Sequence, residues 1–245
     1  MVNYISNKQI EPIPKKVNET ATIILDAAFE IAMKLHELHL CVITDAGLVP
    51  GRDHVAVAAA ALAGGADMIQ LRDKTGNLRE LLPQARTIQA LCHARGAVFI
   101  VNDRVDLALA SDADGAHVGQ EDLPAASARR LLGPKRVLGV STHSRDQADT
   151  AWRVGADYIG FGPIFRTGTK DTGYTPRGPD ALREIRRAVP LPILAIGGIH
   201  LENVSQVIEA GATAPAIISA ITAAPDVAAA ATAFRACVMT VKAQR

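Results

Sequence analysis

An amide and two cations stand at every second position in the segment Gln70-Leu71-Arg72-Asp73-Lys74. Alternate residues of a β-strand point to the same side, so Gln70, Arg72 and Lys74 would share one face. Such a row of hydrogen-bond donors is suited to bind a polyanion. An isolated arginine and lysine two residues apart are more often ordinary solvent-exposed side chains, so this interpretation depends on which other residues gather at the same place.

Two carboxylates have a comparable position in the sequence. Asp103 follows Asn102 at the end of a later apolar run, and Asp122 closes the segment Gly119-Gln120-Glu121-Asp122 after the next run. Mg²⁺ typically uses one or two protein carboxylates and takes its other ligands from water and substrate. Asp103 and Asp122 beside the cations therefore predict a Mg²⁺ site that faces phosphate oxygens. The alternative is that each residue caps the N-terminus of a short helix.

Later segments offer a second place for an anion. The loop 162–170 combines glycines with the hydroxyls of Thr167 and Thr169 and the cation of Lys170, all of which suit phosphate-like groups. The pair Gly197-Gly198 and the hydroxyl of Ser219 follow the last two apolar runs, where glycine lets the backbone approach a ligand and Ser219 could open a helical turn. Two anion sites on one rim suit two phosphorylated substrates.

Ser141 and two histidines raise the question of a hydrolase. Ser141 and His143 lie two residues apart after the fifth apolar run, but the GxSxG elbow is absent and no acid is clearly placed to orient the histidine. We therefore interpret Ser141 as a hydroxyl donor to an anion. His117 lies inside an apolar run and has no second His or Cys at metal-binding spacing, so we expect it to be a packing residue.

Eight short apolar runs must position these residues. Each is followed by a cluster of Gly, Asn, Asp or Ser and then by a helical pattern, which predicts repeated βα units of an α/β protein with a parallel sheet. Eight units predict closure into a single (β/α)₈ TIM barrel, whose active site lies at the carboxyl ends of the strands. An open doubly wound sheet is less consistent, because no GxGxxG turn follows the first run. The predicted strands are Leu40–Thr44, Met68–Arg72, Val98–Val101, Gly115–Val118, Val137–Ser141, Tyr158–Gly162, Ile193–Ile196 and Ala216–Ser219.

The chain of 245 residues is long enough for one such barrel, which we place at residues 39–245. Residues 1–38 are expected to form a loose arm followed by an extra N-terminal helix over Ala21–Leu38, where apolar side chains recur at helical spacing. This arm could also supply a contact in a homo-oligomer.

Charge and cysteine content restrict the partners and the location. The 26 Lys and Arg residues against 25 Asp and Glu residues leave a net charge of +1, which argues against nucleic acid or an anionic membrane as a partner recruited by overall charge. The sequence contains no apolar run of membrane-spanning length and no apolar signal segment at its start. The three distant cysteines argue for a reducing compartment, so we expect a cytoplasmic protein that acts on small-molecule substrates.

Taken in chain order, these motifs resemble those of thiamine phosphate synthase from about Leu40 to the C-terminus. Each motif is short, but the ordered set at these spacings is specific. The segments that carry the resemblance are Gln70–Lys74, Asn102–Arg104, Gly119–Asp122, Gly139–His143, Gly162–Phe165, Thr167–Lys170, Gly197–Ile199 and Ile218–Ile221.

The resemblance implies a Mg²⁺-dependent transferase that joins hydroxymethylpyrimidine diphosphate to a thiazole phosphate, with or without a carboxyl group on the thiazole, and releases diphosphate and thiamine monophosphate. The residues that would hold the pyrimidine diphosphate are Gln70, Arg72, Lys74, Asn102, Ser141 and Lys170. Among these, Arg72, Lys74, Ser141 and Lys170 would be catalytic, and Asp103 and Asp122 would bind Mg²⁺. The residues that would hold the thiazole phosphate are Thr167, Thr169, Gly198, Ile218 and Ser219.

Two other functions stay open at this point. A thiazole tautomerase-like enzyme of the same barrel family would share the phosphate site but tends to lack the metal carboxylates, so Asp103 and Asp122 argue against it. The segment Thr213-Ala214-Pro215 before the last strand departs from the pattern common in the family. That departure leaves room for a regulator that binds a phosphate ligand without turnover.

Overall fold

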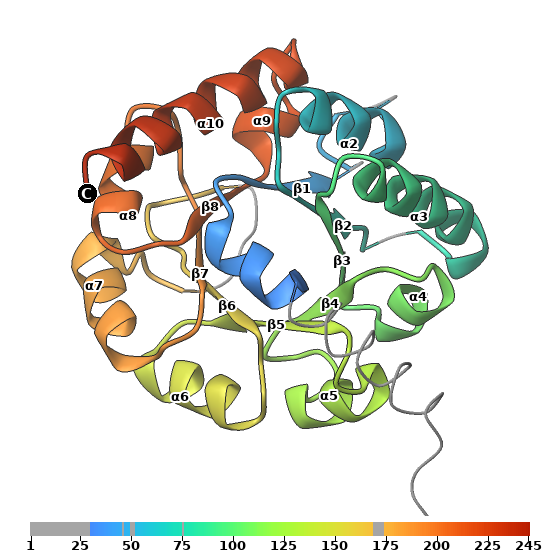
Figure 1. Ribbon diagram of the computed structural model, residues 1–245, viewed down its shortest axis with the longest axis horizontal. Coiled ribbons are helices and arrows are strands. Elements are labelled where there is room, and N and C mark those ends of the chain that lie inside the picture. The colour runs from blue at the N-terminus through green and yellow to red at the C-terminus, as the bar shows by residue number, and fades with distance from the viewer. Residues whose placement is uncertain (1–29, 46, 50–51, 75, 169–173) are drawn as a thin grey trace, which may run out of the picture.

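The computed structural model describes residues 30–45, 47–49, 52–74, 76–168 and 174–245. Its eight parallel strands pair in chain order, and β1 also pairs with β8, so the sheet closes into a barrel. The helices labelled in Figure 1 lie around the outside of this barrel. This arrangement confirms the predicted (β/α)₈ TIM barrel.

Strands and helices alternate along the chain. The strands are β1 (Cys41–Asp45), β2 (Met68–Arg72), β3 (Val98–Asn102), β4 (Gly115–Val118), β5 (Val137–Thr142), β6 (Tyr158–Phe161), β7 (Ile193–Ile196) and β8 (Ala214–Ile217). The helices are α2 (His54–Ala63), α3 (Leu78–His93), α4 (Val105–Ala110), α5 (Ala125–Leu132), α6 (Arg145–Arg153), α7 (Gly178–Ala188), α8 (Val204–Glu209), α9 (Ser219–Thr222) and α10 (Val227–Ala243). Among the described residues, no helix is both long and apolar enough to cross a membrane.

The strands send alternate side chains into two separate cores. In β2, Ile69 and Leu71 belong to the core between the strands and the helices, whereas Met68 belongs to the core inside the barrel. Gln70 and Arg72 continue the inward column that Met68 begins, and they line a chamber above the apolar interior. The period of two therefore delivers polar side chains to the carboxyl end of the barrel.

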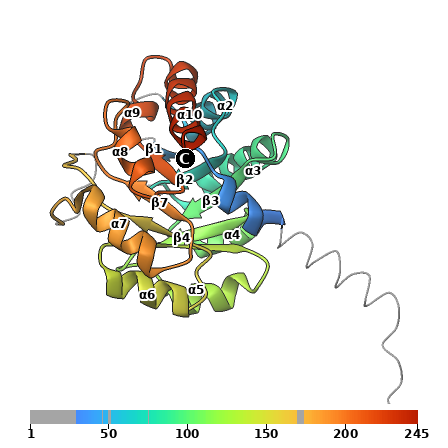
Figure 2. The ribbon, with the colours of Figure 1, turned by 60° about the vertical axis from the view of Figure 1, so that its left-hand side comes forward.

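A short helix covers the other end of the barrel. Residues 30–37 are helical, and Leu35 and Leu38 are only 1% and 2% exposed within the interior core, among the first residues of several strands. Figure 2 shows this helix at the end opposite α9. The rest of the helix predicted over Ala21–Leu38 lies outside the described residues, and the division into an arm of residues 1–38 and a barrel domain stays a prediction.

The last strand differs from its prediction. The predicted strand Ala216–Ser219 is wrong by two residues, because β8 starts at Ala214. Pairing begins at Thr213, whose N–H donates to the carbonyl oxygen of the first residue of β7 at 2.8 Å and whose hydroxyl oxygen accepts from the N–H of the same residue at 3.0 Å. Pro215 cannot donate to a sheet ladder, which hides this register from a sequence pattern. Ser219 instead opens the single-turn helix α9, as predicted.

Candidate active site

Several of the polar side chains predicted to bind substrate meet at the carboxyl end of the barrel interior. They line a chamber of about 60 Å³, which we call the inner chamber, and they are Gln70, Arg72, Asn102 and Ser141. These residues come from β2, β3 and β5, and they meet because each occupies an inward position of its strand.

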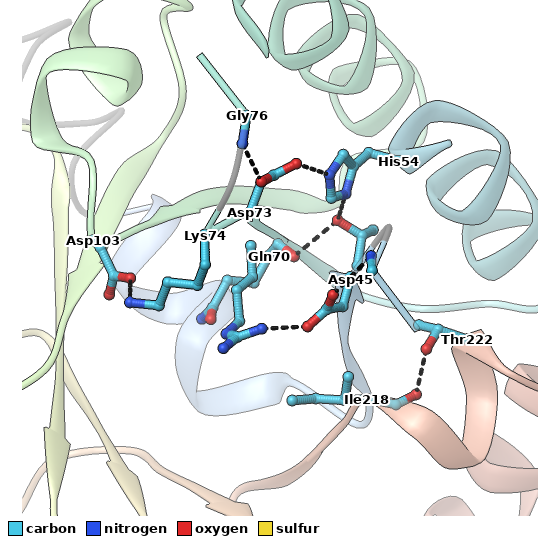
Figure 3. Close-up of polar contacts among 12 residues, drawn as sticks. Asp45, His54, Gln70, Asp73, Lys74, Gly76, Asp103, Ile218 and Thr222 are labelled. Atoms are coloured by element: carbon cyan, nitrogen blue, oxygen red, sulfur yellow. Dashed lines mark hydrogen bonds and ion pairs between the residues drawn. The ribbon is translucent and has the colours of Figure 1, made fainter. Parts of the chain in front are cut away.

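The two cations of β2 and the loop after it each contact a carboxylate (Figure 3). Arg72 forms an ion pair with Asp45 at the end of β1, and both side chains are largely buried. Lys74 is half exposed and forms an ion pair with Asp103, which follows β3. Sequence analysis missed Asp45, although its place at the end of the first predicted strand was a signal. Two cations and two carboxylates therefore stand together over β1, β2 and β3.

The two predicted metal ligands lie next to each other. Burial raises the pKa of Asp103, and a hydrogen bond between its side chain and that of Asp122 raises this pKa further, against the opposing effect of Lys74. The backbone of Asp103 has a positive φ of 63°, and its N–H donates to the carbonyl oxygen of His117 at 2.7 Å. The Asp122 Oδ2 atom accepts from the N–H of Gly119 at 2.8 Å.

Neither of these carboxylates caps a helix. α4 begins after Arg104 and α5 begins after Pro124, and neither N-terminus has a side-chain hydrogen bond from its capping residue. The capping alternative is therefore wrong for Asp103 and for Asp122.

The donor set of Asp103 and Asp122 fits Mg²⁺. Carboxylate oxygens are the hard ligands that this ion prefers, and it usually keeps several positions for water and substrate oxygens. Within the described ranges, no cluster of three or more His, Cys, Asp or Glu side chains could hold a metal ion. A cation bound by this pair would thus need further oxygen ligands, which is the usual situation for Mg²⁺ and not for a structural zinc ion.

His117 belongs to a hydrogen-bonded network at the site. It is 6% exposed, its Nδ1 atom lies 3.0 Å from the Tyr158 hydroxyl, and its Nε2 atom lies 2.9 Å from the Ser141 hydroxyl. Burial raises the pKa of Tyr158, and a hydrogen bond from the side chain of Gln70 opposes this shift. The network thus links Gln70 to Ser141 across the barrel, which the expectation of a packing histidine did not include.

A glycine makes room for this network. A Cβ atom added to Gly139 would stand 2.2 Å from Cζ of Tyr158 and 2.4 Å from Nδ1 of His117. The register places Gly139 beside both residues, on β4 and β6. Glycine at this inward position was the signal in the sequence that a large buried group lies opposite.

A larger cavity of about 460 Å³, which we call the outer cavity, adjoins the inner chamber. Ser141 and Ile218 line both of them. Thr167, Gly198 and Ser219 line the outer cavity, so the structure brings these predicted residues of the thiazole phosphate site together. Two further predicted site residues, Thr169 and Lys170, belong to the loop after β6 and lie outside the described residues.

The two glycines after β7 shape one wall of the outer cavity. Gly197 and Gly198 have positive φ angles of 98° and 63°, a conformation that side chains disfavour. A Cβ atom added to Gly198 would stand 2.4 Å from the carbonyl oxygen of Arg166. Glycine therefore lets the loop after β6 lie directly on the end of β7.

One residue that lines the outer cavity belongs to a stacked pair of rings, a contact that sequence analysis missed. His143 lines the cavity, its Nδ1 atom lies 2.6 Å from the carbonyl oxygen of Gly162, and its ring stacks on Tyr174 with 3.8 Å between centroids. The Arg177 guanidinium lies 5.6 Å from the centre of the Tyr174 ring. Nothing local in the sequence indicates this contact, since it joins the loop after β5 to the segment before α7.

Comparison with known proteins identifies the family. A family model described as thiamine monophosphate synthase matches residues 40–221. The chain is 52% identical over 199 residues to the thiamine-phosphate synthase of Chloroflexus aurantiacus, a match that covers 81% of this chain and 92% of that relative. It is 50% identical over 199 residues to the thiamine-phosphate synthase of Moorella thermoacetica, with 81% and 94% covered.

A solved structure supports the same assignment. The thiamine phosphate pyrophosphorylase from Pyrococcus furiosus is 38% identical to this chain, with a TM-score of 0.78, and the match covers 84% of this chain and 98% of that one. The motifs at the strand ends, the closed barrel and these relatives agree, and the chain belongs to the thiamine monophosphate synthase family of transferases in thiamine biosynthesis.

Proposed function

We propose that this protein joins 4-amino-2-methyl-5-hydroxymethylpyrimidine diphosphate to a thiazole phosphate, which gives thiamine monophosphate and diphosphate. The observation that carries this proposal is the pair of adjoining cavities, one lined by the Arg72 cation and the other by Gly198 and Ser219, with Ser141 in both. A reaction between two phosphorylated substrates needs two anion sites within reach of one reacting centre.

Arg72 and Lys74 are proposed to bind the diphosphate of the first substrate. In the reaction the bond between the pyrimidine methylene and the diphosphate oxygen breaks, and negative charge grows on the departing group. Cations that are already in place stabilise this charge without further reorganisation. Lys170, which lies outside the described residues, is proposed to add a third positive charge.

Gln70, Asn102 and Ser141 are proposed to hold the remainder of the pyrimidine diphosphate. Their amide and hydroxyl groups line the inner chamber. The Ser141 hydroxyl is oriented by Nε2 of His117 at 2.9 Å, which fits a binding role for this residue. No protein nucleophile is needed, because the aminopyrimidine ring stabilises the methylene cation and the thiazole nitrogen captures it.

The outer cavity is proposed to hold the thiazole phosphate. Thr167 and Ser219 offer hydroxyl groups, and the backbone at Gly198 and Ile218 can approach a phosphate closely. Thr169, outside the described residues, is proposed to add a third hydroxyl. Fixing the remote phosphate would hold the thiazole nitrogen near the methylene group, which lowers the entropic part of the barrier.

Asp103 and Asp122 are proposed to hold Mg²⁺. When bound there, the ion would neutralise part of the charge on the diphosphate leaving group. The proposal is supported by the closeness of the two carboxyl groups, whose side chains form a hydrogen bond with each other.

The purified full chain, both substrates and MgCl₂ provide the test of this function. We expect thiamine monophosphate and diphosphate to appear in equal amounts, and only when a divalent cation is present. Absence of product would refute the proposed function. Full activity in EDTA would leave the function standing and refute the metal site.

Substitution of the two carboxylates tests the metal site directly. Asp103→Ala and Asp122→Ala should each lose most turnover and weaken Mg²⁺ binding in calorimetry, while the protein stays folded. Asp106→Ala is the matched control, because Asp106 is an exposed acid that pairs with Arg104 on the surface. A variant that unfolds yet keeps its activity per folded molecule would show that the carboxylate is structural.

A cytoplasmic location and a homo-oligomeric contact through residues 1–38 stay proposals as well. The proposed location rests on the three cysteines, Cys41, Cys92 and Cys237, which are few and far apart in the sequence.

A further inference from the structure

A chain of three polar side chains, Thr44, His54 and Asp73, lies beside the strand end that carries the two cations, and Figure 3 labels His54 and Asp73. The His54 Nε2 atom lies 3.0 Å from Oδ2 of Asp73, and the His54 Nδ1 atom lies 2.8 Å from the Thr44 hydroxyl. The other Asp73 oxygen, Oδ1, accepts from the N–H of Gly76 at 2.6 Å. The chain therefore joins β1, the start of α2 and the loop after β2.

The partners of His54 indicate its tautomer. An ionised carboxylate only accepts hydrogen bonds, so Nε2 of His54 carries the hydrogen that Asp73 accepts. In the neutral ring Nδ1 then accepts from the Thr44 hydroxyl at 2.8 Å, and the other acceptor near this hydroxyl, the carbonyl oxygen of Gln70, lies farther away at 3.5 Å. The order of acid, imidazole and hydroxyl resembles that of a hydrolase triad.

Burial excludes direct chemistry by these three groups. Thr44 is 0% exposed and His54 is 2% exposed, and the Asp73 side chain is 13% exposed. They lie on the outer side of the sheet, against α2, whereas Arg72 points to the inner chamber. A substrate in the barrel mouth cannot reach the Thr44 hydroxyl, so any contribution to the reaction must act through neighbouring residues.

Those neighbours are the charged groups of the site. Asp73 stands between Arg72 and Lys74 in the chain, and Thr44 precedes Asp45, the carboxylate that pairs with Arg72. Tethering Asp73 to α2 and to the N–H of Gly76 fixes the backbone from which both cations extend. Without the tether, the turn after β2 would lose two hydrogen bonds that define its shape.

We propose that His54 is a positioning residue that holds the end of β2 against β1 and α2, so that Arg72 and Lys74 face the diphosphate together. This role rests on the proposed function, since it assumes that the diphosphate binds at these cations. The outer cavity is lined mainly by β5 to β8 and the loops after them, with Leu48 from the loop after β1, and it shares no residue with the chain of Thr44, His54 and Asp73. Loss of His54 should therefore affect one substrate and spare the other.

The test uses His54→Leu and Asp73→Ala in the full chain. We expect kcat/KM for the pyrimidine diphosphate to fall about tenfold or more in each, on the scale of a buried polar group left without its partner. The KM for the thiazole phosphate should stay within about twofold of the original value. Amide hydrogen exchange at Gly76 should become faster in both variants, which is a readout independent of turnover.

Matched variants separate positioning from general stability. Asp73→Asn keeps an acceptor for the Gly76 N–H, and its amide group can donate to Nε2 when the ring adopts its other tautomer and Nδ1 donates to Thr44, so it should retain most activity. Ser111→Ala removes a buried hydroxyl that donates to the Leu107 carbonyl oxygen on α4 and that lines neither cavity, so it should lower stability without changing either KM.

The outcomes are distinct. A selective loss for the pyrimidine diphosphate with faster exchange at Gly76, recovered in Asp73→Asn, supports the positioning role. Unchanged kinetics and exchange in His54→Leu, or equal losses for both substrates that follow the fraction of folded protein, would overturn it. Calorimetry of inorganic diphosphate binding to the same variants tests the positioning role without any turnover. Failure of the parent protein to form thiamine monophosphate would refute the proposed function, and the two failures can therefore be told apart.

Discussion

Arg72 and Lys74 each carry a carboxylate partner within the protein, Asp45 and Asp103. Two cations held close together would repel each other and move apart if no opposite charge compensated them. The carboxylates keep the cations near the barrel mouth before a diphosphate arrives. Such preorganisation is what a site for a charged leaving group requires, because little rearrangement then remains for the reaction itself.

Arg72 and Ser219 stand at opposite ends of the site and should contribute differently. Arg72→Ala should lower kcat about a hundredfold, because its charge is proposed to stabilise the departing diphosphate. Ser219→Ala should mainly raise KM for the thiazole phosphate, about tenfold if a hydrogen bond of about 1.5 kcal/mol to a charged group is lost. Steady-state kinetics with each substrate varied in turn measures both effects.

The control for the first variant is Arg72→Lys, which keeps a positive charge beside Asp45 while losing the planar fork of donors. It should retain more kcat than Arg72→Ala. An Arg72→Ala variant with unchanged kcat, or a Ser219→Ala variant that weakens only the pyrimidine diphosphate, would contradict the assignment of the two ends.

At the scale of elements, the neighbouring strands β4, β5 and β6 pack around a pair of large buried side chains. Tyr158 on β6 and His117 on β4 meet across β5, where Gly139 has no side chain to keep them apart. The strand between them thus contributes space as well as Ser141. The side-chain hydrogen bonds that link β4, β5 and β6 through His117 depend on that space.

Gly139→Ala should force this arrangement open, because the added Cβ atom would stand 2.2 Å from the Tyr158 ring. We expect a loss of about 1–3 kcal/mol in the free energy of unfolding, as for other overpacked cores. Displacement of His117 should also lower kcat/KM through Ser141. Urea denaturation and kinetics on the same sample check both results.

Gly160→Ala is a control for that prediction, because it introduces a weaker steric clash with the same histidine. Its added Cβ atom would stand 3.1 Å from Cε1 of His117, so a small shift of the ring relieves the contact. Stability and activity should fall less than in Gly139→Ala. Equal effects in the two variants would mean that this network does not depend on the room at Gly139.

At the scale of the whole molecule, the two ends of the barrel have separate tasks. The carboxyl end holds the polar site, and the helical residues 30–37 cover the amino end with Leu35 and Leu38. Lys242 in α10 donates to the carbonyl oxygen of Leu38 at 2.6 Å, which ties this cover to the last helix. Residues of the cover at the amino end should therefore affect stability and leave activity unchanged.

Leu35→Ala should create a cavity in the barrel interior and cost about 2–5 kcal/mol in the free energy of unfolding. Activity per folded molecule should stay the same, because the site lies at the other end. Met33→Ala is the control, since Met33 on the same helix is 46% exposed and its loss should change stability by less than about 0.5 kcal/mol. A loss of activity in fully folded Leu35→Ala would contradict the separation of tasks.

Much of this protein could be predicted from local patterns in the sequence. The eight apolar runs predicted the closed barrel, because parallel strands alternate with helices in a regular order along the chain. The alternation within Gln70 to Lys74 predicted which side chains of β2 face inward, since the period of two belongs to a single strand. The order of the motifs then predicted the family, which the relatives confirm.

The partners of these residues were decided only by the tertiary structure. Asp45 beside Arg72, His54 beside Asp73 and the start of β8 at Ala214 all depend on how neighbouring strands are registered and where a helix packs against them. A period along one strand carries no information about register against the next, and hydrogen bonds form only within a few tenths of an ångström of their preferred distance. The sequence by itself therefore determined which residues could do the chemistry, and the packing of distant segments decided what holds each of them in place.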